Sequence, residues 1–396
     1  MKNLLISITI LLLLNNSSEA FNPFKILFDK KQKVDKVFLD TSLDESAYKL
    51  DKYPNILGYK NNEYLLLYGG NGKVWLMDMF GKKYREWKTD IKRARLLKNC
   101  NLMVIDTNLD HYIAEKNTQG EIQWKYDTQG PTHHDLEVSD NGNIITFLYR
   151  KALPEDVEID IGCKNSEIFT DSVLQINRNG DRLFEWQFHE HFLDVLKKQQ
   201  CDSKTMQHMK HSDYASRLDW THPNAVNVLK DNKWYRKGHK EFRPGNILVT
   251  VHHFSKIILI DRESSEVVWS YEGDDDYPLE HSHEAKMIPK GYPGAGNILI
   301  FDNGHLRKYT RVIEIDPITK KTLWVYQDPG KFYSIWAGSH QRLKNRDTFI
   351  SDDMSGRAFI VNRQGKIKWQ FTKDGEKWVK RAHLYLKKDF AHCIDL

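Results

Sequence analysis

Histidines in this chain gather beside carboxylate, amide and arginine side chains, just ahead of segments in which apolar and polar residues alternate. Five such stretches occur: His133-His134-Asp135, Asp219-Trp220-Thr221-His222-Pro223-Asn224, His281-Ser282-His283-Glu284, Ser339-His340-Gln341 and Arg381-Ala382-His383. A neutral imidazole can act as a nucleophile or a base, a protonated one can act as an acid, and a guanidinium adds positive charge. These groups suit the transfer of an anionic group such as sulfuryl or phosphoryl, whose transition state carries negative charge on its oxygens.

More polar residues follow other apolar segments, namely His252-His253, Asp302-Asn303-Gly304 with Arg311, and Asp352-Asp353. Clustered histidines can also bind a metal, with Asp135, Glu284 and Asp302 orienting the ligands, and polar side chains can simply line a wet channel. We expect an active or binding site without a metal, because neither a His-Glu-x-x-His nor an EF-hand spacing occurs. Walker, GxGxxG and GxSxG motifs are also missing from the sequence, which removes the usual nucleotide-binding and hydrolase classes.

A repeated unit positions these residues. An alternating strand, a polar turn with Asp or Asn, and a second strand carrying tryptophan recur six times, ending at Trp87, Trp124, Trp186, Trp269, Trp324 and Trp369. Each unit is typical of a β-hairpin, and another pair of strands joined at a Gly-Asn turn precedes most copies. The pattern predicts an all-β fold, a six-bladed β-propeller of four-stranded antiparallel blades. The first strand of each blade then lines the central channel, so the histidine stretches should meet at one mouth, while the tryptophans fill gaps between blades.

The repeat also defines the domain organisation. Residues 1–20, with Lys2, an apolar run and Ser18-x-Ala20, are typical of a signal peptide cleaved after Ala20, so we expect a periplasmic or secreted protein. Residues 21–54 form a lead-in segment and residues 55–396 the propeller, with insertions at 151–170 and 189–218. The second insertion looks helical, and its pairs His189/His191 and His208/His211 fit a solvated helix face. Lys380 to Tyr385 echoes Lys92 to Leu97 and is predicted to close the ring as its last strand.

Composition excludes several classes of protein. Of 396 residues, 40% are hydrophobic, 29% charged and 12% aromatic, which is typical of a folded globular chain. The net charge of +5 is small and no basic stripe occurs, so we expect no nucleic-acid partner. No later segment is long enough to span a bilayer, so no stable membrane insertion is expected. The four cysteines lack CxxC spacing; three pairings are open, and Cys163 with Cys201, which flank an insertion, is the natural candidate pair.

Several stretches in this order resemble the bacterial arylsulfotransferase (aryl sulfate sulfotransferase) family, over about residues 55–380. They are Asp219-Trp220-Thr221-His222-Pro223-Asn224, His281-Ser282-His283-Glu284, Phe301-Asp302-Asn303-Gly304, Thr310-Arg311-Val312-Ile313-Glu314-Ile315-Asp316 and Ser339-His340-Gln341-Arg342-Leu343. The resemblance implies a six-bladed propeller that moves a sulfuryl group from a phenolic sulfate ester to a phenol. It implies a sulfohistidine intermediate and neither a nucleotide donor nor a cofactor.

The resemblance also suggests roles. His222 and His283 match two channel histidines, Arg311 matches the channel arginine, and His340 is the candidate for the sulfurylated histidine. We expect His340 to attack sulfur, Arg311 and one of His222 and His283 to hold the sulfuryl oxygens, and the other histidine to protonate the departing phenolate. The residues expected to contact substrate are His134, His252, His253, Asn224, Asp302 and Asn303. The alternative is a non-catalytic propeller that binds a small anionic ligand, a glycan or a protein in the same mouth.

Overall fold

The computed structural model describes residues 47–50, 53–59, 62–70, 72–106, 111–150, 167–192, 217–372 and 379–394. The chain divides into two units, Met1–Asp40 and Thr41–Leu396, and every described residue belongs to the second. The predicted signal segment and most of each predicted insertion lie outside the described residues, as do Cys163, Cys201, His208 and His211.

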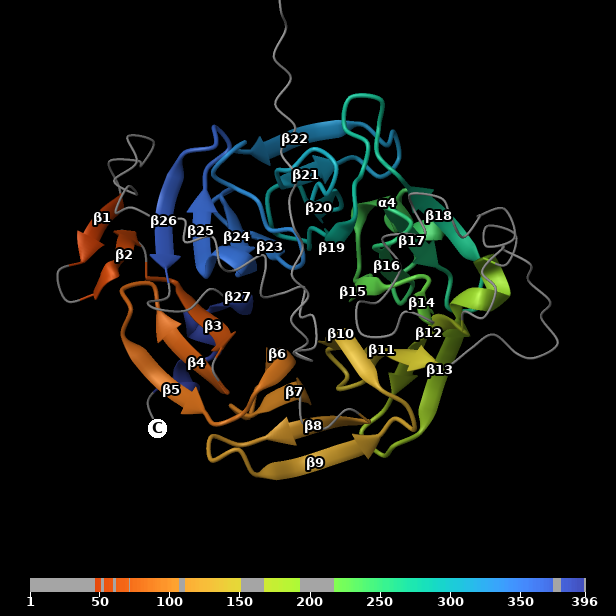
Figure 1. The fold of residues 1–396 in the computed structure, drawn as a ribbon, viewed down its shortest axis with the longest axis horizontal. Coiled ribbons are helices and arrows are strands. Elements are labelled where there is room, and N and C mark those ends of the chain that lie inside the picture. The colour runs from red at the N-terminus through yellow and green to blue at the C-terminus, as the bar shows by residue number, and fades with distance from the viewer. Residues whose placement is uncertain are drawn as a thin grey trace, which may run out of the picture. The chain divides into compact units, whose positions relative to one another are not determined.

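Six antiparallel sheets form the blades of a propeller, with the first-named strand of each blade innermost (Figure 1). Blade 1 contains β27 (Lys380–Leu386), β3 (Tyr64–Gly70), β4 (Lys73–Asp78) and β5 (Lys83–Trp87); blade 2 contains β6 (Ile91–Leu96), β7 (Leu102–Asp106), β8 (Tyr112–Lys116) and β9 (Ile122–Asp127); blade 3 contains β10 (Thr132–Val138), β11 (Ile144–Arg150), β12 (Glu167–Ile176) and β13 (Arg182–Gln187). Blade 4 contains β15 (Pro223–Val228), β16 (Ile247–Val251), β17 (Lys256–Ile260) and β18 (Val267–Tyr271); blade 5 contains β19 (Ser282–Met287), β20 (Ile298–Asp302), β21 (Arg311–Ile315) and β22 (Thr322–Gln327); blade 6 contains β23 (Ser339–Arg342), β24 (Thr348–Asp352), β25 (Arg357–Val361) and β26 (Ile367–Thr372). The predicted fold class is confirmed.

The ring closes inside blade 1. There β27, from the C-terminal end of the chain, pairs with β3, and Leu384 lies opposite Leu66. The prediction that the segment from Lys380 closes the ring is therefore confirmed. Two further strands, β2 (Tyr53–Tyr59) and β1 (Ala47–Leu50), extend blade 6 beyond β26, while β14 (Arg217–Asp219) pairs in parallel with β12. Because β12 begins at Glu167, the last residues of the predicted insertion 151–170 are strand.

The turns of the six tryptophan hairpins share one mechanism. In blade 3 the Asn177 side-chain oxygen accepts from the backbone N–H groups of Asn179 and Asp181, both at 2.9 Å, and so takes the place of a backbone acceptor in the turn. The equivalent acceptors in the other blades are Asp78, Asn117, Asp261, Asp316 and Asn362. The Asp or Asn of each repeat is therefore a turn-forming residue.

The repeated tryptophans join neighbouring blades. Each of five indole N–H groups donates to a carbonyl in the hairpin turn of the next blade, at 2.8 to 3.0 Å: Trp124 to Arg178, Trp186 to Ser265, Trp269 to Pro317, Trp324 to Arg363 and Trp369 to Met79. Trp87 is fully buried, but its indole N–H has no partner among the described residues. The expected gap-filling role is confirmed, and the hydrogen bond explains why phenylalanine would not serve equally well.

The hydrophobic core is divided among the interfaces between blades. Six clusters of buried apolar side chains occur in the described part of the chain, one for each neighbouring pair of blades. The cluster between blades 6 and 1 contains Leu66, Trp369 and Leu384, so ring closure buries its own core. Each blade is thus apolar on both faces, which leaves the channel edge of the inner strands for polar residues.

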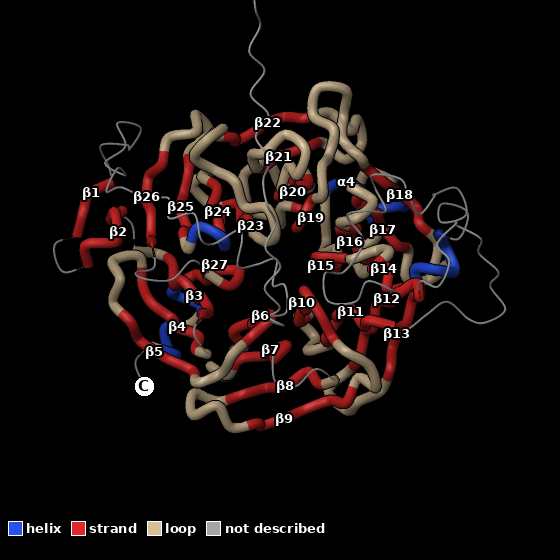
Figure 2. The backbone as a smooth tube through the Cα atoms, in the orientation of Figure 1, coloured by secondary structure: helices blue, strands red, loops and turns tan. Residues whose placement is uncertain are grey.

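Helices are few and short in the described residues (Figure 2). They are α4 (Lys233–Arg236), η1 (Lys240–Phe242), η2 (Asp353–Ser355), η3 (Lys387–Asp389) and η4 (Ala391–Cys393). Residues 188–192, at the start of the second predicted insertion, are also helical. Among the described residues no helix is long and apolar enough to cross a membrane.

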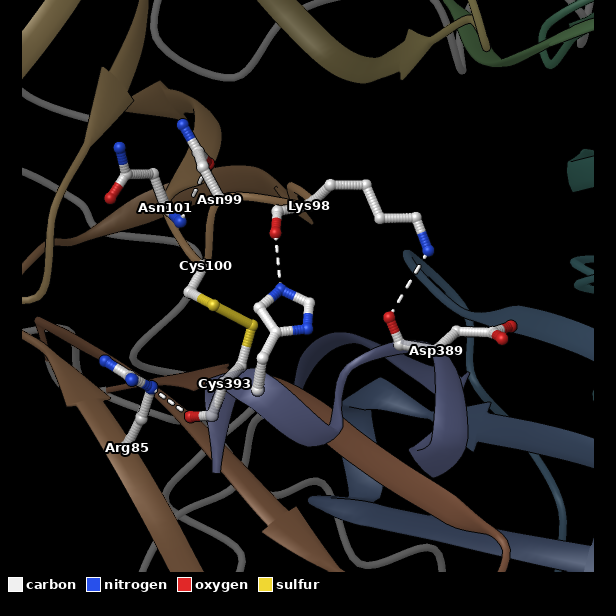
Figure 3. Close-up of a disulfide and its surroundings, with 8 residues drawn as sticks. Arg85, Lys98, Asn99, Cys100, Asn101, Asp389 and Cys393 are labelled. Atoms are coloured by element: carbon white, nitrogen blue, oxygen red, sulfur yellow. Dashed lines mark hydrogen bonds between the residues drawn. A yellow bond between two sulfur atoms is a disulfide. The ribbon is translucent and has the colours of Figure 1, made fainter. Parts of the chain in front are cut away.

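A disulfide between Cys100 and Cys393 links the segment after the closing strand to the loop between β6 and β7 (Figure 3). The two cysteines lie 293 residues apart in sequence, and both are buried. The Arg85 side chain donates to the Cys393 carbonyl beside the bond. The sequence analysis left this pairing open; it is compatible with a second pair between Cys163 and Cys201, which stays a prediction.

Removal of this disulfide should lower stability. A bond across so long a loop restricts the unfolded chain strongly, so the double variant Cys100→Ser/Cys393→Ser should lose about 3–5 kcal/mol of unfolding free energy. Denaturant unfolding followed by tryptophan fluorescence measures the loss, with Lys388→Ser, at an exposed position near Cys393, as the control. Equal midpoints for the double variant and the wild type would contradict a stabilising bond.

Candidate active site

Seven imidazoles meet where the inner strands of blades 3, 4 and 5 begin; we call them the mouth cluster. Its members are His134, His222, His252, His253, His281, His283 and His305. The ring of His222 lies 4.3 Å from that of His134 and 4.7 Å from that of His253, centre to centre. His252 lies within 6.0 Å of five others, centre to centre: His222, His253, His281, His283 and His305. The predicted meeting of histidines from separate blades at one end of the channel is therefore observed.

Irregular backbone brings these side chains to the mouth. The pairing of the first two strands contains a bulge in blades 3, 4 and 5, at His134, Asn224 and His283 respectively. In addition, φ is positive at His134 (58°), His222 (47°), His281 (56°) and Arg381 (40°). Non-glycine residues in this region cost free energy and concentrate at functional sites. The strain at the mouth therefore points to function rather than to packing.

Asp219 orients His222. The Nδ1 atom of His222 contacts the Asp219 carboxylate directly, and the backbone N–H of His222 donates to Asp171 at 3.2 Å. Burial by itself lowers the pKa of His222, but the charge of Asp219 outweighs it and holds that pKa above the ordinary value of 6.5. Burial opposes ionisation of Asp219 as well, yet His222 draws the pKa of that carboxyl below its usual range. The pair therefore favours an imidazolium beside a carboxylate, with Nε2–H available as an acid.

His252 and His253 have the opposite character. The Nδ1–H of His252 donates to the Ser282 carbonyl at 3.2 Å, and that of His253 donates to the Asp219 carbonyl at 2.7 Å. A proton held on Nδ1 leaves a lone pair on Nε2. Burial, followed by the nearby charge of His222, lowers the pKa of His253 to about 4 and that of His252 well below the ordinary value. Both imidazoles are therefore neutral bases at physiological pH.

His283 is held in a third state. The side-chain N–H of Asn224 donates to Nδ1 of His283 at 3.1 Å, so the His283 proton lies on Nε2. Burial, with the nearby guanidinium of Arg381, keeps the pKa of His283 well below 6.5. Arg381 itself donates to the Asn224 carbonyl at 2.7 Å, and its backbone N–H donates to Asp353 at 3.0 Å. A neutral N–H donor and a fixed positive charge thus stand side by side at the mouth.

A buried network of charges lies beneath the cluster. Asp135 of β10 accepts from Arg93 at 2.7 Å and from Arg95 at 3.1 Å, and lies 3.6 Å from Arg381. Glu284 of β19 pairs with Lys286 at 2.7 Å and with Arg93 at 3.4 Å. The side chains of Arg93, Asp135 and Glu284 are fully buried, so these ion pairs fix the inner strands of blades 1, 2, 3 and 5 relative to one another.

Arg311 lies in blade 5 outside the mouth cluster. It donates to the Pro278 carbonyl at 2.6 Å and to Asp302 at 3.2 Å. Blade 6 repeats the arrangement, because Arg357 occupies the same position and donates to Asp352 at 3.0 Å. An interaction that two blades share is more consistent with holding the blade together than with catalysis. The structure thus places Arg381, rather than Arg311, beside the histidines.

Asp302 and Asn303 are occupied by backbone groups near the mouth. Asp302 accepts from the Glu280 backbone N–H at 2.7 Å and from the Ser282 hydroxyl at 2.9 Å, besides its arginine partners. The Asn303 side chain donates to the carbonyls of Ser334 and Ala337. These bonds fix the loops that carry His281 and His305. The Oδ1 atom of Asn303 is buried without a hydrogen-bond partner among the described residues, so this acceptor remains open to a ligand.

His340 does not join the mouth cluster. Its backbone N–H donates to Glu284 at 2.9 Å, its Nε2 contacts the Glu284 carbonyl at 3.2 Å, and its side chain is buried. The β23–β24 pairing has no bulge, so His340 takes the position that is apolar in every other inner strand. Those apolar residues are Ala94, Leu136, Val226, Ala285 and Leu384. The expectation that His340 meets His222 and His283 is not met.

The structure also changes which of the other histidines occupy equivalent positions in their blades. Counting back from the strand ends, His134 and His283 are equivalent, whereas His222 is equivalent to His281 and Asn224 to His283. The sequence analysis missed Asp171, Asp219, Arg381 and His305 as site residues. Asp219 and Arg381 belong to two of the histidine stretches found in the sequence, so the sequence did point to their positions. Their contacts could not be predicted, because they depend on the direction in which each bulge turns the side chain.

Within the described part of the chain, two groups of side chains have the donor atoms to hold a metal. Asp219, His222 and His253 offer ligand atoms within 4.8 Å of one another, as do Cys100, His392 and Cys393. The second group is engaged as a disulfide. In the first group, Asp219 and His222 already contact each other directly, which fits an acid–imidazole pair. The expectation of no metal and no cofactor stays a prediction.

The fold and the site define a six-bladed β-propeller with a histidine-lined channel mouth. The family model described as Arylsulfotransferase (ASST) matches residues 99–374, more than half of the chain, so the chain belongs to the arylsulfotransferase family. This membership supports a sulfotransferase enzyme in general. A search among curated proteins finds no match.

Solved structures with similar folds share little sequence with this chain. A protein of unknown function from Bacteroides caccae has a TM-score of 0.50 and 11% identity, covering 82% of this chain and 99% of its own. A functionally unknown protein from Desulfotomaculum acetoxidans has a TM-score of 0.45 and 9% identity, covering 81% and 98%. An inactive virginiamycin B lyase variant from Staphylococcus aureus, with quinupristin, has a TM-score of 0.36 and 11% identity. The match covers 81% of this chain and 74% of the lyase chain. At such identities the likeness concerns the fold alone.

The Asp219–His222 pair should make stability depend on pH. The raised pKa of His222 contributes stability below pH 6.5 that is lost as pH rises through that pKa; the lowered pKa of Asp219 contributes stability that is lost as pH falls through it. Asp219→Asn should therefore destabilise the protein more at about pH 6 than at about pH 9, and should lower the pKa of His222. Thermal unfolding and imidazole NMR titration measure these effects. An unchanged His222 titration in the variant would refute the pairing.

Proposed function

We propose that the protein transfers a sulfuryl group from a phenolic sulfate ester to a phenol, through a sulfohistidine formed in the mouth cluster. The observation that carries the proposal is that hydrogen bonds fix three neighbouring imidazoles in three proton states. His222 is the acid, His252 the base or nucleophile, and His283 a neutral N–H donor. Family membership supports the reaction class, and the geometry supports this division of roles.

In the first half-reaction, Nε2 of His252 attacks the sulfur of the aryl sulfate. The N–S bond forms as the bond from sulfur to the phenolic oxygen breaks, and the electron pair of that bond leaves with the phenolate. His222 donates its Nε2 proton to the phenolate oxygen, which matters because a phenol with a pKa of about 10 leaves poorly as an anion at neutral pH. Arg381 and the Nε2–H of His283 stabilise the negative charge on the sulfuryl oxygens.

The second half-reaction reverses these steps with a new phenol. Neutral His222 now accepts the proton of the incoming hydroxyl, whose oxygen attacks sulfur as the N–S bond breaks. His252 regains its lone pair and His222 its proton, so the enzyme returns to its starting state. The Nδ1–H bond from His252 to the Ser282 carbonyl can persist throughout, which keeps Nε2 directed at the site. No nucleotide donor and no cofactor enters this scheme.

This proposal moves the nucleophile from His340 to His252, for a geometric reason. His340 contacts Glu284 through both its backbone and its ring, and it lines a cavity whose lining includes no histidine of the mouth cluster. His252 lies at the centre of the cluster, and its neighbours His222 and His281 are only half-buried, which gives the site access to solvent.

We further place the enzyme outside the cytoplasm. The proposal rests on the signal-like N-terminal sequence and on the Cys100–Cys393 disulfide. Structural disulfides persist mainly in oxidising compartments, such as the periplasm or the extracellular space.

The nucleophile can be identified by trapping. Wild type incubated with 4-nitrophenyl sulfate and no acceptor should gain the mass of one sulfuryl group, on a peptide that contains His252. His252→Asn should lose this adduct and more than about 10³-fold in turnover. His340→Asn, and the control His239→Asn in the loop after α4, should keep both. An adduct that disappears in His340→Asn and persists in His252→Asn would overturn the assignment, and an absence of any turnover would favour a binding protein.

The two arginines separate positioning of substrate from stability. Arg381→Gln should lower kcat/KM by about 10²–10³-fold, because the sulfuryl oxygens lose a charged partner in the transition state. Arg311→Gln should lower the melting temperature and leave kcat/KM of the folded enzyme within about tenfold of wild type, since it removes a bond inside blade 5. Initial rates with 4-nitrophenyl sulfate, beside thermal unfolding, measure both. The reverse pattern would restore Arg311 as the channel arginine.

A further inference from the structure

A cavity lies at the end of the channel opposite the mouth cluster. Its volume is about 400 Å³, and the final part of every inner strand contributes to its wall: Leu96, Val138, Val228, Met287, Arg342 and Tyr385. The mouth cluster lies where inner strands begin. Because the inner strands all run from the mouth towards this end, the two sites lie at opposite ends of the channel; we call the second one the far cavity.

The far cavity has a cationic inner surface. Arg95 and Lys286 line it, and His340 and His383 stand beside them. The Nη2 atom of Arg95 is bonded to Asp135, but its Nη1 is buried without a hydrogen-bond partner. A buried donor without a partner costs free energy unless a ligand or water satisfies it. This atom therefore indicates a position where an acceptor belongs.

The charges around the far cavity leave an excess of positive charge. The charged side chains that line it are four cations, Arg95, Lys230, Lys286 and Arg342, against two carboxylates, Glu137 and Asp231. Burial raises the pKa of Glu137, against the opposing effects of Asn227, Arg95 and Lys286. Burial together with Lys286 and Arg95 keeps the pKa of His383 well below its ordinary value. An anion bound here would balance the cations.

Much of the remaining wall is apolar, although the side chains of Asn227, Asn232 and Gln341 also line it. Val138, Val228, Met287, Ile288 and Pro289 line it, together with the ring of Tyr292. A cavity of this size suits a molecule of one or two rings. An inorganic anion would satisfy the cations but leave the apolar wall in contact with water, whereas an anion with an apolar body satisfies both.

No histidine of the mouth cluster lines the far cavity. The side chains of Arg93, Asp135 and Glu284 have no exposed surface. Ligands at the two ends would therefore occupy separate sites, although both would contact groups of the same network: Arg95 at one end and Arg381 at the other share Asp135.

We propose that the far cavity is a second binding site, which takes a small organic anion with an aromatic or branched aliphatic body and one carboxylate, sulfate or sulfonate group. The anionic group bonds to Arg95 Nη1 and Lys286, and the body packs on Val138, Val228 and Tyr292. The site needs no turnover, so it stands whether or not the mouth cluster transfers sulfuryl groups.

Calorimetric titration with benzenesulfonate tests the proposal, because the carbon–sulfur bond of this probe prevents sulfuryl transfer. Wild type should bind it, and the neutral analogue benzyl alcohol should bind at least about tenfold more weakly, since it cannot pair with the buried cations. Val228→Trp should fill the far cavity and weaken binding there by at least about tenfold. The matched control Val268→Trp, at an exposed valine of β18, should bind as wild type does.

Two further measurements locate the site. Arg95→Met should weaken binding as Val228→Trp does, whereas Arg381→Gln should affect only a site at the mouth. The His383 imidazole resonance should shift on addition of benzenesulfonate in wild type and in Arg381→Gln, and should not shift in Val228→Trp. A lack of binding by wild type, or binding that Val228→Trp leaves intact while Arg381→Gln abolishes it, would overturn the proposal, provided that thermal unfolding shows the variants folded.

Discussion

The buried carboxylate of Asp135 is the interaction on which the site depends. It faces Arg93, Arg95 and Arg381, which come from the inner strands of two other blades, and it is itself fully buried. Loss of one partner from such a group costs about 3–5 kcal/mol, because a charge is left uncompensated. The same contact holds Arg381 where it donates to Asn224, and Asn224 in turn sets the proton of His283. The buried Asp135 therefore controls the proton position of His283 at the mouth, through Arg381 and Asn224.

Ring closure is the second requirement, since no blade carries a complete site. The closing strand β27 brings Arg381 to the channel from the C-terminal end of the chain, while His222 and His283 come from blades 4 and 5. The indole bond from Trp369 to Met79 and the disulfide from Cys393 to Cys100 both hold this closure from outside the channel. If the ring did not close, Arg381 would be missing from the mouth, whereas the histidines of blades 3, 4 and 5 do not depend on the closing strand for their positions.

The repeat made the fold predictable from sequence, because tryptophans and turn-forming Asp or Asn residues mark each blade at a fixed place. Much of the mouth cluster followed from it, since four of its seven histidines lie just before or at the start of inner strands. The exact register did not follow. A bulge adds a residue without changing the apolar pattern, so His340 resembled His283 in sequence, while the regular pairing of β23 directed it away from the mouth cluster and towards the far cavity. Likewise, Arg311 lies in a motif that resembles the family's channel arginine. In the structure it forms an ion pair with Asp302, and blade 6 contains the equivalent ion pair between Arg357 and Asp352.

The strained backbone at the mouth and the fixed proton states have one cause. Each positive φ at His134, His222, His281 and Arg381 costs of the order of 1–3 kcal/mol, and a glycine at any of them would relieve it. Side chains are retained there because the entry to each inner strand is where imidazoles can reach carbonyl, carboxylate and amide partners at once. Three kinds of partner create three kinds of imidazole, and the rings of His222 and His283 both lie within 6.0 Å of the ring of His252. One residue type, placed on a repeated scaffold, can thereby supply the acid, the nucleophile and the N–H donor of a single reaction.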